Sequence, residues 1–420
     1  MQRSRPKIVL LHASSETDSY SLDWLDAFLQ FPAIDAVPIH LNELKTAPAL
    51  LKKEMERSDF IVALHSTNTN PTNIRNYMVY MPILLKRKVP LITFVGNEYN
   101  IPFNGCRLGE KIRLFNYLRP EILCTQLPLA SAQKLYACLQ PYTQVQEYPH
   151  ALNEKLFTPY KKQSDRKIDL GIKTGRYGNY LGDDERNRIV DYFRSNAASL
   201  GLTANIENAS NSKVGRNDWV EFLNSCKGTI GNESGTFFTE PDDHTVVEIM
   251  HYVRKKMGLK KQPAWFAWYE KMLYNYHPLI PYRFWLWLFD LFNTKLFFLR
   301  FAEYNLYSAV SEYNFQEIFE HFFRNYQNPV STRCISSRHF DAIGTKTCQI
   351  LFDGEYNSIL KANEHYIHLK TDFSNIEEAV HQFKDETFRT KLVDSTYAYI
   401  CDKHRYVHRV ERFCQEILMK

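Results

Sequence analysis

Several features that mark specialised classes of protein are scarce in this 420-residue sequence. Its eight cysteines are scattered and include no Cys-X-X-Cys pair, so neither a disulfide scaffold nor a zinc site is indicated. The net charge is only +5, which falls short of the basic footprint of a nucleic-acid-binding domain. We therefore expect reduced thiols, no metal ion and no nucleic-acid partner, as in an ordinary cytoplasmic protein.

Long uncharged apolar runs are also missing. Near the start, residues 8–11 form the run Ile-Val-Leu-Leu, which is too short for a signal peptide. The longest apolar stretch, residues 279–301, carries charged side chains at four positions. Because a membrane-spanning helix needs about 20 mostly apolar residues, we expect no transmembrane segment.

What is present is the composition of a globular protein, with 44% hydrophobic and 24% charged residues. Short apolar segments alternate with segments of helical periodicity, which is typical of parallel sheets with helices on both faces. Two series of strands are predicted on either side of a polar, basic stretch. The first comprises residues 7–11, 59–64, 90–95, 121–125 and 143–148, and the second comprises residues 168–172, 228–230, 348–352 and 366–369.

The polar stretch, residues 158–166, is the best linker in the chain. We therefore predict an α/β fold in which two Rossmann-like domains face a central cleft and are followed by C-terminal helices. The predicted boundaries are residues 1–157 for the first domain and 158–395 for the second. Residues 396–420 are predicted to form a last helix that packs back on the first domain.

In parallel sheets, functional side chains lie in the loops that follow the carboxyl ends of the strands. One such loop in the second domain contains Glu233 and Ser234 between two glycines. The glycines let the backbone approach a ligand, and the carboxylate could accept hydrogen bonds from sugar hydroxyls. The alternative is a plain turn.

Two further loops of the second domain suit a phosphate. Arg338 follows two serines that can cap a helix, so a helix N-terminus and a guanidinium could bind a diphosphate without metal. Glu355 follows the next predicted strand at the same sheet edge. Lys173 and Arg176 follow the first strand of the domain, and their loop also fits phosphate contact. In each case solvated charges on a structural loop are the alternative.

Three side chains at strand ends of the first domain compete for a catalytic role. Glu98 follows the strand at 90–95 and is the favoured general base or acceptor-binding group. His12 and His65 end the strands at 7–11 and 59–64. A lone histidine is more often structural, so both rank behind Glu98.

Beyond single motifs, the second half resembles bacterial glycosyltransferases of the group 1 kind, especially the branch similar to the spore-maturation CgeB proteins. The resemblance spans most of residues 149–383. Its segments are residues 149–159 (PHALNEKLFTP), 181–193 (LGDDERNRIVDYF), 219–235 (WVEFLNSCKGTIGNESG) and 336–375. It implies a GT-B fold, with the nucleotide donor on the second domain and the acceptor on the first. It also implies that positive side chains and helix dipoles, and no divalent ion, stabilise the leaving diphosphate.

The resemblance carries residue roles as well. Arg338 matches the basic residue that opens the donor helix, and Asp341 falls where many relatives have a donor-contacting glutamate. Glu355 and Tyr356 fall in the loop that approaches the diphosphate. One departure concerns the paired glutamates of many retaining relatives: the position eight residues before Asp341 is Arg333. The mechanism that depends on that pair is therefore not implied.

Aromatic residues make up 14% of the chain and concentrate between positions 262 and 326, among lysines and arginines. One interpretation is an amphipathic surface that rests on the inner membrane, where a lipid-linked acceptor would be found. The other is a helical subdomain packed against the second Rossmann-like domain.

These observations predict a glycosyltransferase that moves a sugar from a nucleoside-diphosphate sugar to a saccharide or lipid-linked glycan in bacterial surface polysaccharide synthesis. No cofactor and no metal are expected, and the location is cytoplasmic, at the inner membrane if the aromatic surface binds lipid. Two alternatives stay open. One is a non-catalytic protein that binds nucleotide sugars or carbohydrate, and the other is a sugar-nucleotide epimerase on the same scaffold.

Overall fold

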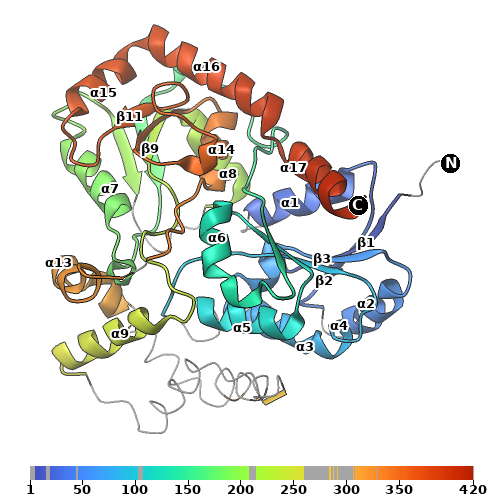
Figure 1. The fold of residues 1–420 in the computed structure, drawn as a ribbon. Coiled ribbons are helices and arrows are strands. Elements are labelled where there is room, and N and C mark those ends of the chain that lie inside the picture. Colours follow the sequence, from blue (N-terminus) through green and yellow to red (C-terminus); the bar gives the residue numbers. More distant parts are fainter. Residues whose placement is uncertain are drawn as a thin grey trace.

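The computed structural model describes residues 5–15, 19–43, 46–102, 107–207, 214–259, 308–327 and 329–419, together with positions 283, 284, 287, 291 and 306. It contains two parallel sheets, each covered by helices (Figure 1). The predicted α/β fold with two Rossmann-like domains and C-terminal helices, the GT-B arrangement, is therefore confirmed.

The first domain is built on a six-stranded parallel sheet with the order β2-β1-β3-β4-β5-β6. Its inner strands are apolar on both faces because helices cover both sides of the sheet. The strands at the two edges, β2 and β6, are more polar. The strands are β1 (Lys7–His12), β2 (Asp35–His40), β3 (Phe60–Ala63), β4 (Leu91–Phe94), β5 (Ile122–Thr125) and β6 (Gln144–Glu147).

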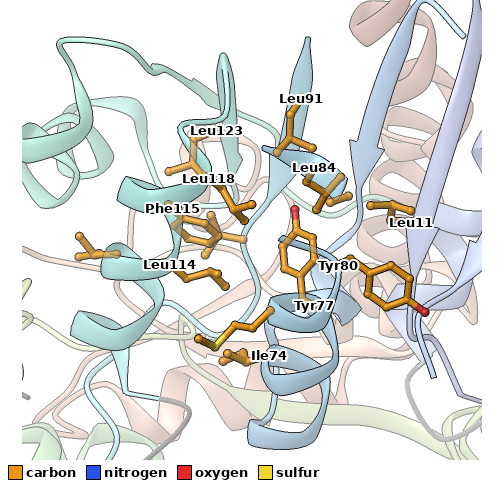
Figure 2. Packing of buried hydrophobic residues seen from close by; sticks show 14 of the residues in the cluster. Leu11, Ile74, Tyr77, Tyr80, Leu84, Leu91, Leu114, Phe115, Leu118 and Leu123 are labelled. Atoms are coloured by element: carbon orange, nitrogen blue, oxygen red, sulfur yellow. The ribbon is translucent and has the colours of Figure 1, made fainter. Parts of the chain in front are cut away.

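Alternate side chains of β1 enter two separate cores, one on each face of the sheet. Val9 and Leu11 lie in the first core, whereas Ile8 and Leu10 lie in the second. Figure 2 shows the first core, in which Tyr77 lies among leucines from several elements. The helices of this domain are α1 (Ser19–Gln30), α2 (Ala47–Met55), η1 (His65–Asn68), α3 (Pro71–Val79), α4 (Met81–Leu84), α5 (Leu108–Leu118), α6 (Leu129–Leu135) and η2 (Ala137–Leu139).

The second domain is built on a five-stranded parallel sheet with the order β11-β10-β9-β7-β8. All residues of the inner strand β10 are buried, as expected for a strand with helices on both faces. The strands are β7 (Ile168–Lys173), β8 (Ala204–Glu207), β9 (Cys226–Gly231), β10 (Cys348–Phe352) and β11 (Ile367–Leu369). The helices are η3 (Gln163–Asp165), η4 (Asn179–Leu181), α7 (Glu185–Asn196), α8 (Arg216–Ser225), α14 (Ser337–Gly344), η7 (Tyr356–Ser358), α15 (Ile376–Lys384) and α16 (Glu386–Lys403).

Between β9 and β10 the chain leaves the second sheet and reaches the first domain. This segment includes α9 (His244–Lys256), α13 (Phe315–Ile318) and the π-helical turn η6 (Phe319–Phe323). Asn100 of the first domain exchanges two hydrogen bonds with the backbone of Glu240, at 2.8 and 3.0 Å. Most of the predicted aromatic region, residues 262–326, lies outside the described residues. Among its described residues, Leu306 and several from 308 onward contribute to an apolar cluster with α9. Among the helices described, none combines the length and the apolar character needed to cross a bilayer.

The last helices bring the chain back to the first domain. α16 crosses the predicted boundary at residue 395 without a break. α17 (Tyr406–Phe413) and η8 (Cys414–Leu418) then pack on α1, and Val410 and Phe413 enter the core that contains Trp24. The chain passes between the domains near Leu152 and again near Arg405. A β-bridge between these two residues joins the two connecting segments.

Candidate functional site

A narrow cavity lies at the carboxyl ends of the second sheet, between β7, β9 and the N-terminus of α14. Its volume is about 50 Å³, whereas ligand pockets typically measure about 300–1,000 Å³. A nucleotide would therefore have to widen it. The polar and aromatic lining includes Thr174, Arg186, Trp219, Asn232, Arg338 and His339, and no aspartate or glutamate is found among the described residues that line it.

The N-terminus of α14 forms one wall of this cavity. Ser336 precedes the helix, and its N–H donates to Nδ1 of His339 over 3.1 Å. Burial, together with the nearby Arg186, lowers the pKa of His339 to about 3, so the ring is neutral at pH 7. The N-terminus of a helix carries a partial positive charge that favours anions. This wall can thus attract an anion without a charged histidine.

Two arginines add full positive charges. Arg338 donates to the backbone oxygen of Lys173 over 2.8 Å, and its guanidinium lies 5.5 Å from the ring centre of Trp219. Arg186 donates to Oδ1 of Asn232 over 3.3 Å and lies 4.4 Å from the ring centre of Tyr177. Each guanidinium group thus contacts an aromatic ring and donates to an amide oxygen. Neither guanidinium forms an ion pair with a described residue. Their charges therefore remain available to a phosphate.

The structure places two other predicted phosphate ligands outside the cavity. Nζ of Lys173 pairs with Glu207 at 3.2 Å, and only the backbone of Lys173 reaches Arg338. Arg176 pairs with Asp191 at 3.0 Å, where both side chains are exposed. Their basic loop thus adjoins the site without lining it.

Glu233 and Ser234 form contacts with other residues of the second domain. Glu233 is only 3% exposed; its Oε2 accepts from Nε of Arg333 over 3.2 Å, and its Oε1 accepts from the N–H of Tyr356 over 2.7 Å. Ser234 forms a backbone bridge with Cys334. Neither side chain lines the cavity, so a role of Glu233 in donor binding would require a change of partners.

Arg333 is the centre of a buried charge cluster. Besides Glu233, it contacts Glu185 at 2.5 Å and Asp183 at 3.4 Å. Burial lowers the pKa of Arg333, but these carboxylates outweigh burial and raise it above its usual value. The sequence identified Arg333 only as a missing carboxylate. In the structure, its single positive charge offsets part of the negative charge of these three carboxylates.

Asp341 and Tyr356 also lie away from the cavity. Oδ2 of Asp341 accepts from Nε1 of Trp219 over 3.0 Å. Burial, followed by the charge of Asp23, raises the pKa of Asp341 well above its usual range. The side chain of Tyr356 is fully buried, and its hydroxyl donates to the backbone oxygen of Phe352 over 2.8 Å.

The turn after β10 joins the two domains. Glu355 is exposed there, beside Tyr356, Asn357 and Ser358, which all have positive φ values of 43°, 52° and 58°. Such a left-handed run is unfavourable for residues with side chains. Nδ2 of Asn357 donates to the backbone oxygen of Gln126 over 3.0 Å. The strained turn therefore holds a contact across the domain boundary.

Glu98 lies in the first domain, as predicted, after β4. It is only 3% exposed and accepts hydrogen bonds from the hydroxyls of Thr125 and Tyr136, both at 2.6 Å. Burial raises the pKa of Glu98 to about 7, although these hydrogen bonds and Lys111 oppose the shift. Such a value suits a general base at neutral pH. An acceptor would first have to displace one of the two hydroxyls.

The two histidines pack against other rings: His12 against His40, and His65 against aromatic residues and His150. His65 is fully buried, and neither ring nitrogen has a hydrogen-bond partner among the described residues. Burial, with His150 nearby, lowers the pKa of His65 well below its usual value. Burial, with His40 nearby, lowers the pKa of His12 to about 4. Both rings are thus neutral at pH 7.

Sequence reasoning missed Arg186, Trp219 and His339, which line the cavity beside Arg338. Arg186 and Trp219 lie within segments 181–193 and 219–235, so the resemblance contained them without marking their roles. His339 adjoins Arg338 and could have been found as a cap partner of Ser336. In the part of the chain that is described, no group of three His, Cys, Asp or Glu side chains could hold a metal ion.

No protein-family model matches the sequence, and no curated protein matches it. Similar solved structures include Anabaena Alr3699/HepE in complex with UDP-glucose, with a TM-score of 0.47 and 9% identity over 99% of this chain and 100% of that one. The lipopolysaccharide outer core galactosyltransferase WaaB has a TM-score of 0.41 and 8% identity over 98% of this chain and 99% of that one. A UDP-N-acetylglucosamine 2-epimerase has a TM-score of 0.39 and 8% identity over 99% of this chain and 96% of that one. At these low identities and TM-scores, the similarities do not indicate a function. The residues of the cavity have to carry any functional conclusion.

Proposed function

We propose that this protein is a glycosyltransferase that uses a nucleoside-diphosphate sugar and a saccharide or lipid-linked acceptor, with a role in bacterial surface polysaccharide synthesis. The observation that carries the proposal is the cavity of the second domain. It combines two unpaired guanidinium groups with the N-terminus of α14 and lacks a carboxylate among its described lining residues.

This arrangement suits a leaving diphosphate. When the bond to the sugar breaks, negative charge grows on the phosphate oxygens, and groups already fixed around them stabilise that charge. Arg186 and Arg338 are held by Asn232, Tyr177 and the backbone of Lys173, so little reorganisation is needed. In this proposal the two arginines and the helix N-terminus take the place of a divalent ion.

The acceptor is proposed to bind the first domain. Glu98 is the proposed base there, because its pKa of about 7 lets it accept a proton from a hydroxyl near neutral pH. His12 and His65 rank behind it, since burial disfavours the charged form of both rings.

Binding of UDP, GDP and CMP, measured by titration calorimetry, tests the donor site. A hydrogen bond from a charged group contributes about 1.5–3 kcal/mol. We therefore expect Arg338→Ala and Arg186→Ala each to raise Kd at least about tenfold. Arg188→Ala is the matched control, because Arg188 lies on the same helix as Arg186 but pairs with Asp184 at 3.1 Å. Unchanged Kd values in both cavity variants would refute the site.

Turnover is tested separately, by hydrolysis of UDP-, GDP- and CMP-sugars in the presence and absence of saccharide acceptors. We expect slow hydrolysis that depends on Arg338. The non-catalytic alternative is favoured by one observation: Arg333 stands where retaining relatives have a glutamate, and three carboxylates already hold it. Tight nucleotide binding without any hydrolysis or transfer would support that alternative.

A further inference from the structure

A wide polar groove follows the free edge of the first sheet. It lies between α6 and α17, which are both labelled in Figure 1, and has a volume of about 830 Å³. That volume is within the range of sites that hold ligands of several rings. The cavity of the second domain has no lining residue in common with it. The polar lining of the groove includes Gln133, Gln140, Gln144, Gln146, Arg412 and Glu416.

The floor of the groove is β6, the edge strand. The N–H groups of Gln144 and Tyr148 donate toward β5, to Glu121 and Thr125, at 2.9 and 2.6 Å. Because alternate residues of a strand bond to the same neighbour, the backbone groups of Val145 between them face the groove. No other described strand pairs with this edge. The groove thus offers backbone donors and acceptors in addition to side chains.

The charged groups of the groove are occupied by one another or by the backbone. Arg412 pairs with Glu416 at 3.1 Å and donates to the backbone oxygen of Glu147 over 2.6 Å. The carboxylate of Glu147 accepts from the N–H of Leu129 over 2.9 Å and from Asn357 over 2.8 Å. An anionic ligand would therefore find no unpaired cation among the described lining residues, because Arg412 is the only cation there and is already paired.

What remains for a ligand is a set of glutamine amides. Each amide both donates and accepts hydrogen bonds, as a sugar hydroxyl does. Gln144 and Gln133 are exposed and offer their amides to the groove, whereas Oε1 of Gln146 is buried and has no hydrogen-bond partner among the described residues. The lining thus matches a neutral ligand rich in hydroxyl groups. β6 has only four residues, which is short for the addition of a peptide strand.

One end of the groove meets the boundary between the domains. Glu147 lines the groove, and its carboxylate accepts from Asn357, which belongs to the strained turn after β10. Asn357 also reaches Gln126, next to the hydroxyl of Thr125 that binds Glu98. A linear ligand in the groove would therefore point one end toward the proposed acceptor site.

We propose that this groove binds a neutral oligosaccharide of several units and holds an acceptor or product chain outside the reaction centre. This inference rests on the proposed function, because glycosyl transfer supplies the reason for a saccharide chain to end at the domain boundary. It assigns a substrate class, a chain of uncharged sugars, to a surface that the donor cavity does not include.

An array of immobilised neutral and acidic oligosaccharides, from one to eight units long, tests the proposal with the purified full chain. We expect retention of neutral oligosaccharides of three or more units. Gln133→Ala/Gln144→Ala is expected to reduce that binding at least about tenfold, because two hydrogen bonds from exposed amides are lost. Gln382→Ala is the matched control, since Gln382 is partly exposed on α15, away from the groove lining, and bonds to Glu378 at 3.3 Å. Equal thermal unfolding of the three proteins excludes a loss of fold.

Several outcomes would overturn the proposal: no retention of neutral oligosaccharides, a preference for single or acidic sugars, retention of extended peptides alone, or binding unchanged in the double variant. Calorimetry with UDP, GDP and CMP on the same proteins separates this inference from the proposed function. The groove variant is expected to bind nucleotide normally, whereas Arg338→Ala is expected to keep oligosaccharide binding. Retention on the array without any nucleotide binding would refute the proposed function and leave the groove assignment standing.

Discussion

The two Rossmann-like domains differ in the charge state of the side chains at the carboxyl edges of their sheets. At the carboxyl edge of the second sheet, Arg186 and Arg338 keep full charges that no described carboxylate neutralises. At the same edge of the first sheet, burial shifts Glu98, His12 and His65 toward their neutral forms. One architecture thus places two arginines without ion pairs at one edge, and at the other it places titratable groups that burial shifts toward their neutral forms. The difference suits a diphosphate donor and an uncharged acceptor.

The largest expected effect concerns the buried charge cluster of the second domain. Arg333→Met leaves Asp183, Glu185 and Glu233 without their guanidinium, so we expect the free energy of unfolding to fall by about 3–5 kcal/mol. Chemical denaturation at pH 7 measures this change. A loss below about 1 kcal/mol would mean that the cluster is open to solvent, and the contrast between the two halves would weaken.

The next effect concerns Glu98 in the first domain. Burial raises its pKa from 4.5 to about 7, so the folded protein binds this proton more tightly than the unfolded chain does. The free energy of unfolding of the wild type should therefore fall, relative to that of Glu98→Gln, as pH rises from 4.5 to 7. The expected difference is roughly 3 kcal/mol.

Denaturation of both proteins at a series of pH values checks this expectation. Parallel curves for the wild type and Glu98→Gln would show that the pKa of Glu98 is the same in the folded and unfolded protein, so that Glu98 is ionised at pH 7. In that case the first domain would hold a buried negative charge, and the comparison with the second domain would fail.

A smaller effect is expected for His65→Leu. The ring lacks hydrogen-bond partners among the described residues, so leucine should raise the free energy of unfolding at pH 7 by about 1 kcal/mol. Because the pKa of His65 is lowered from 6.5 in the folded state, the wild type loses stability as pH falls below 6.5. The gain should therefore grow at acidic pH. A loss of transfer activity at unchanged stability would instead assign His65 a catalytic role.

The smallest effect is expected for Arg176→Ala. Arg176 forms an exposed pair with Asp191, and such pairs contribute about 0–1 kcal/mol. Stability and the Kd for nucleotide should both stay within about twofold of the wild type. A tenfold rise in Kd would place Arg176 in the donor site despite its position outside the cavity.

The sequence predicted the inner strands and two of the four edge strands, β6 and β11, and missed the other two edges. Residues 348–352 are apolar except for Gln349, and β10 has the predicted bounds. β2 (Asp35–His40) and β8 (Ala204–Glu207) were not predicted, and both are edge strands. An edge strand has one neighbour and a partly exposed face, so it tolerates polar residues and the proline at position 38. The periodic signal that marks inner strands is absent there.

The site was harder to predict, for a related reason. Arg338 could be placed in the cavity wall because a helix cap is a local signal. Arg333 and its partners lie 100 to 150 residues apart in the chain, so no local pattern joins them. Glu98 and His65 occupy loop positions after strands, as functional groups do, and only the packing around them reveals their burial.

The return of α17 to α1 has a consequence for synthesis of the chain. Most of the first domain leaves the ribosome early, but Val410 and Phe413, which complete its core beside Trp24, leave it only after the second domain. A nascent chain that stops near residue 400 would therefore expose the apolar side of α1, a natural target for chaperones. Co-translational folding of this domain should finish only after residues 406–418 emerge.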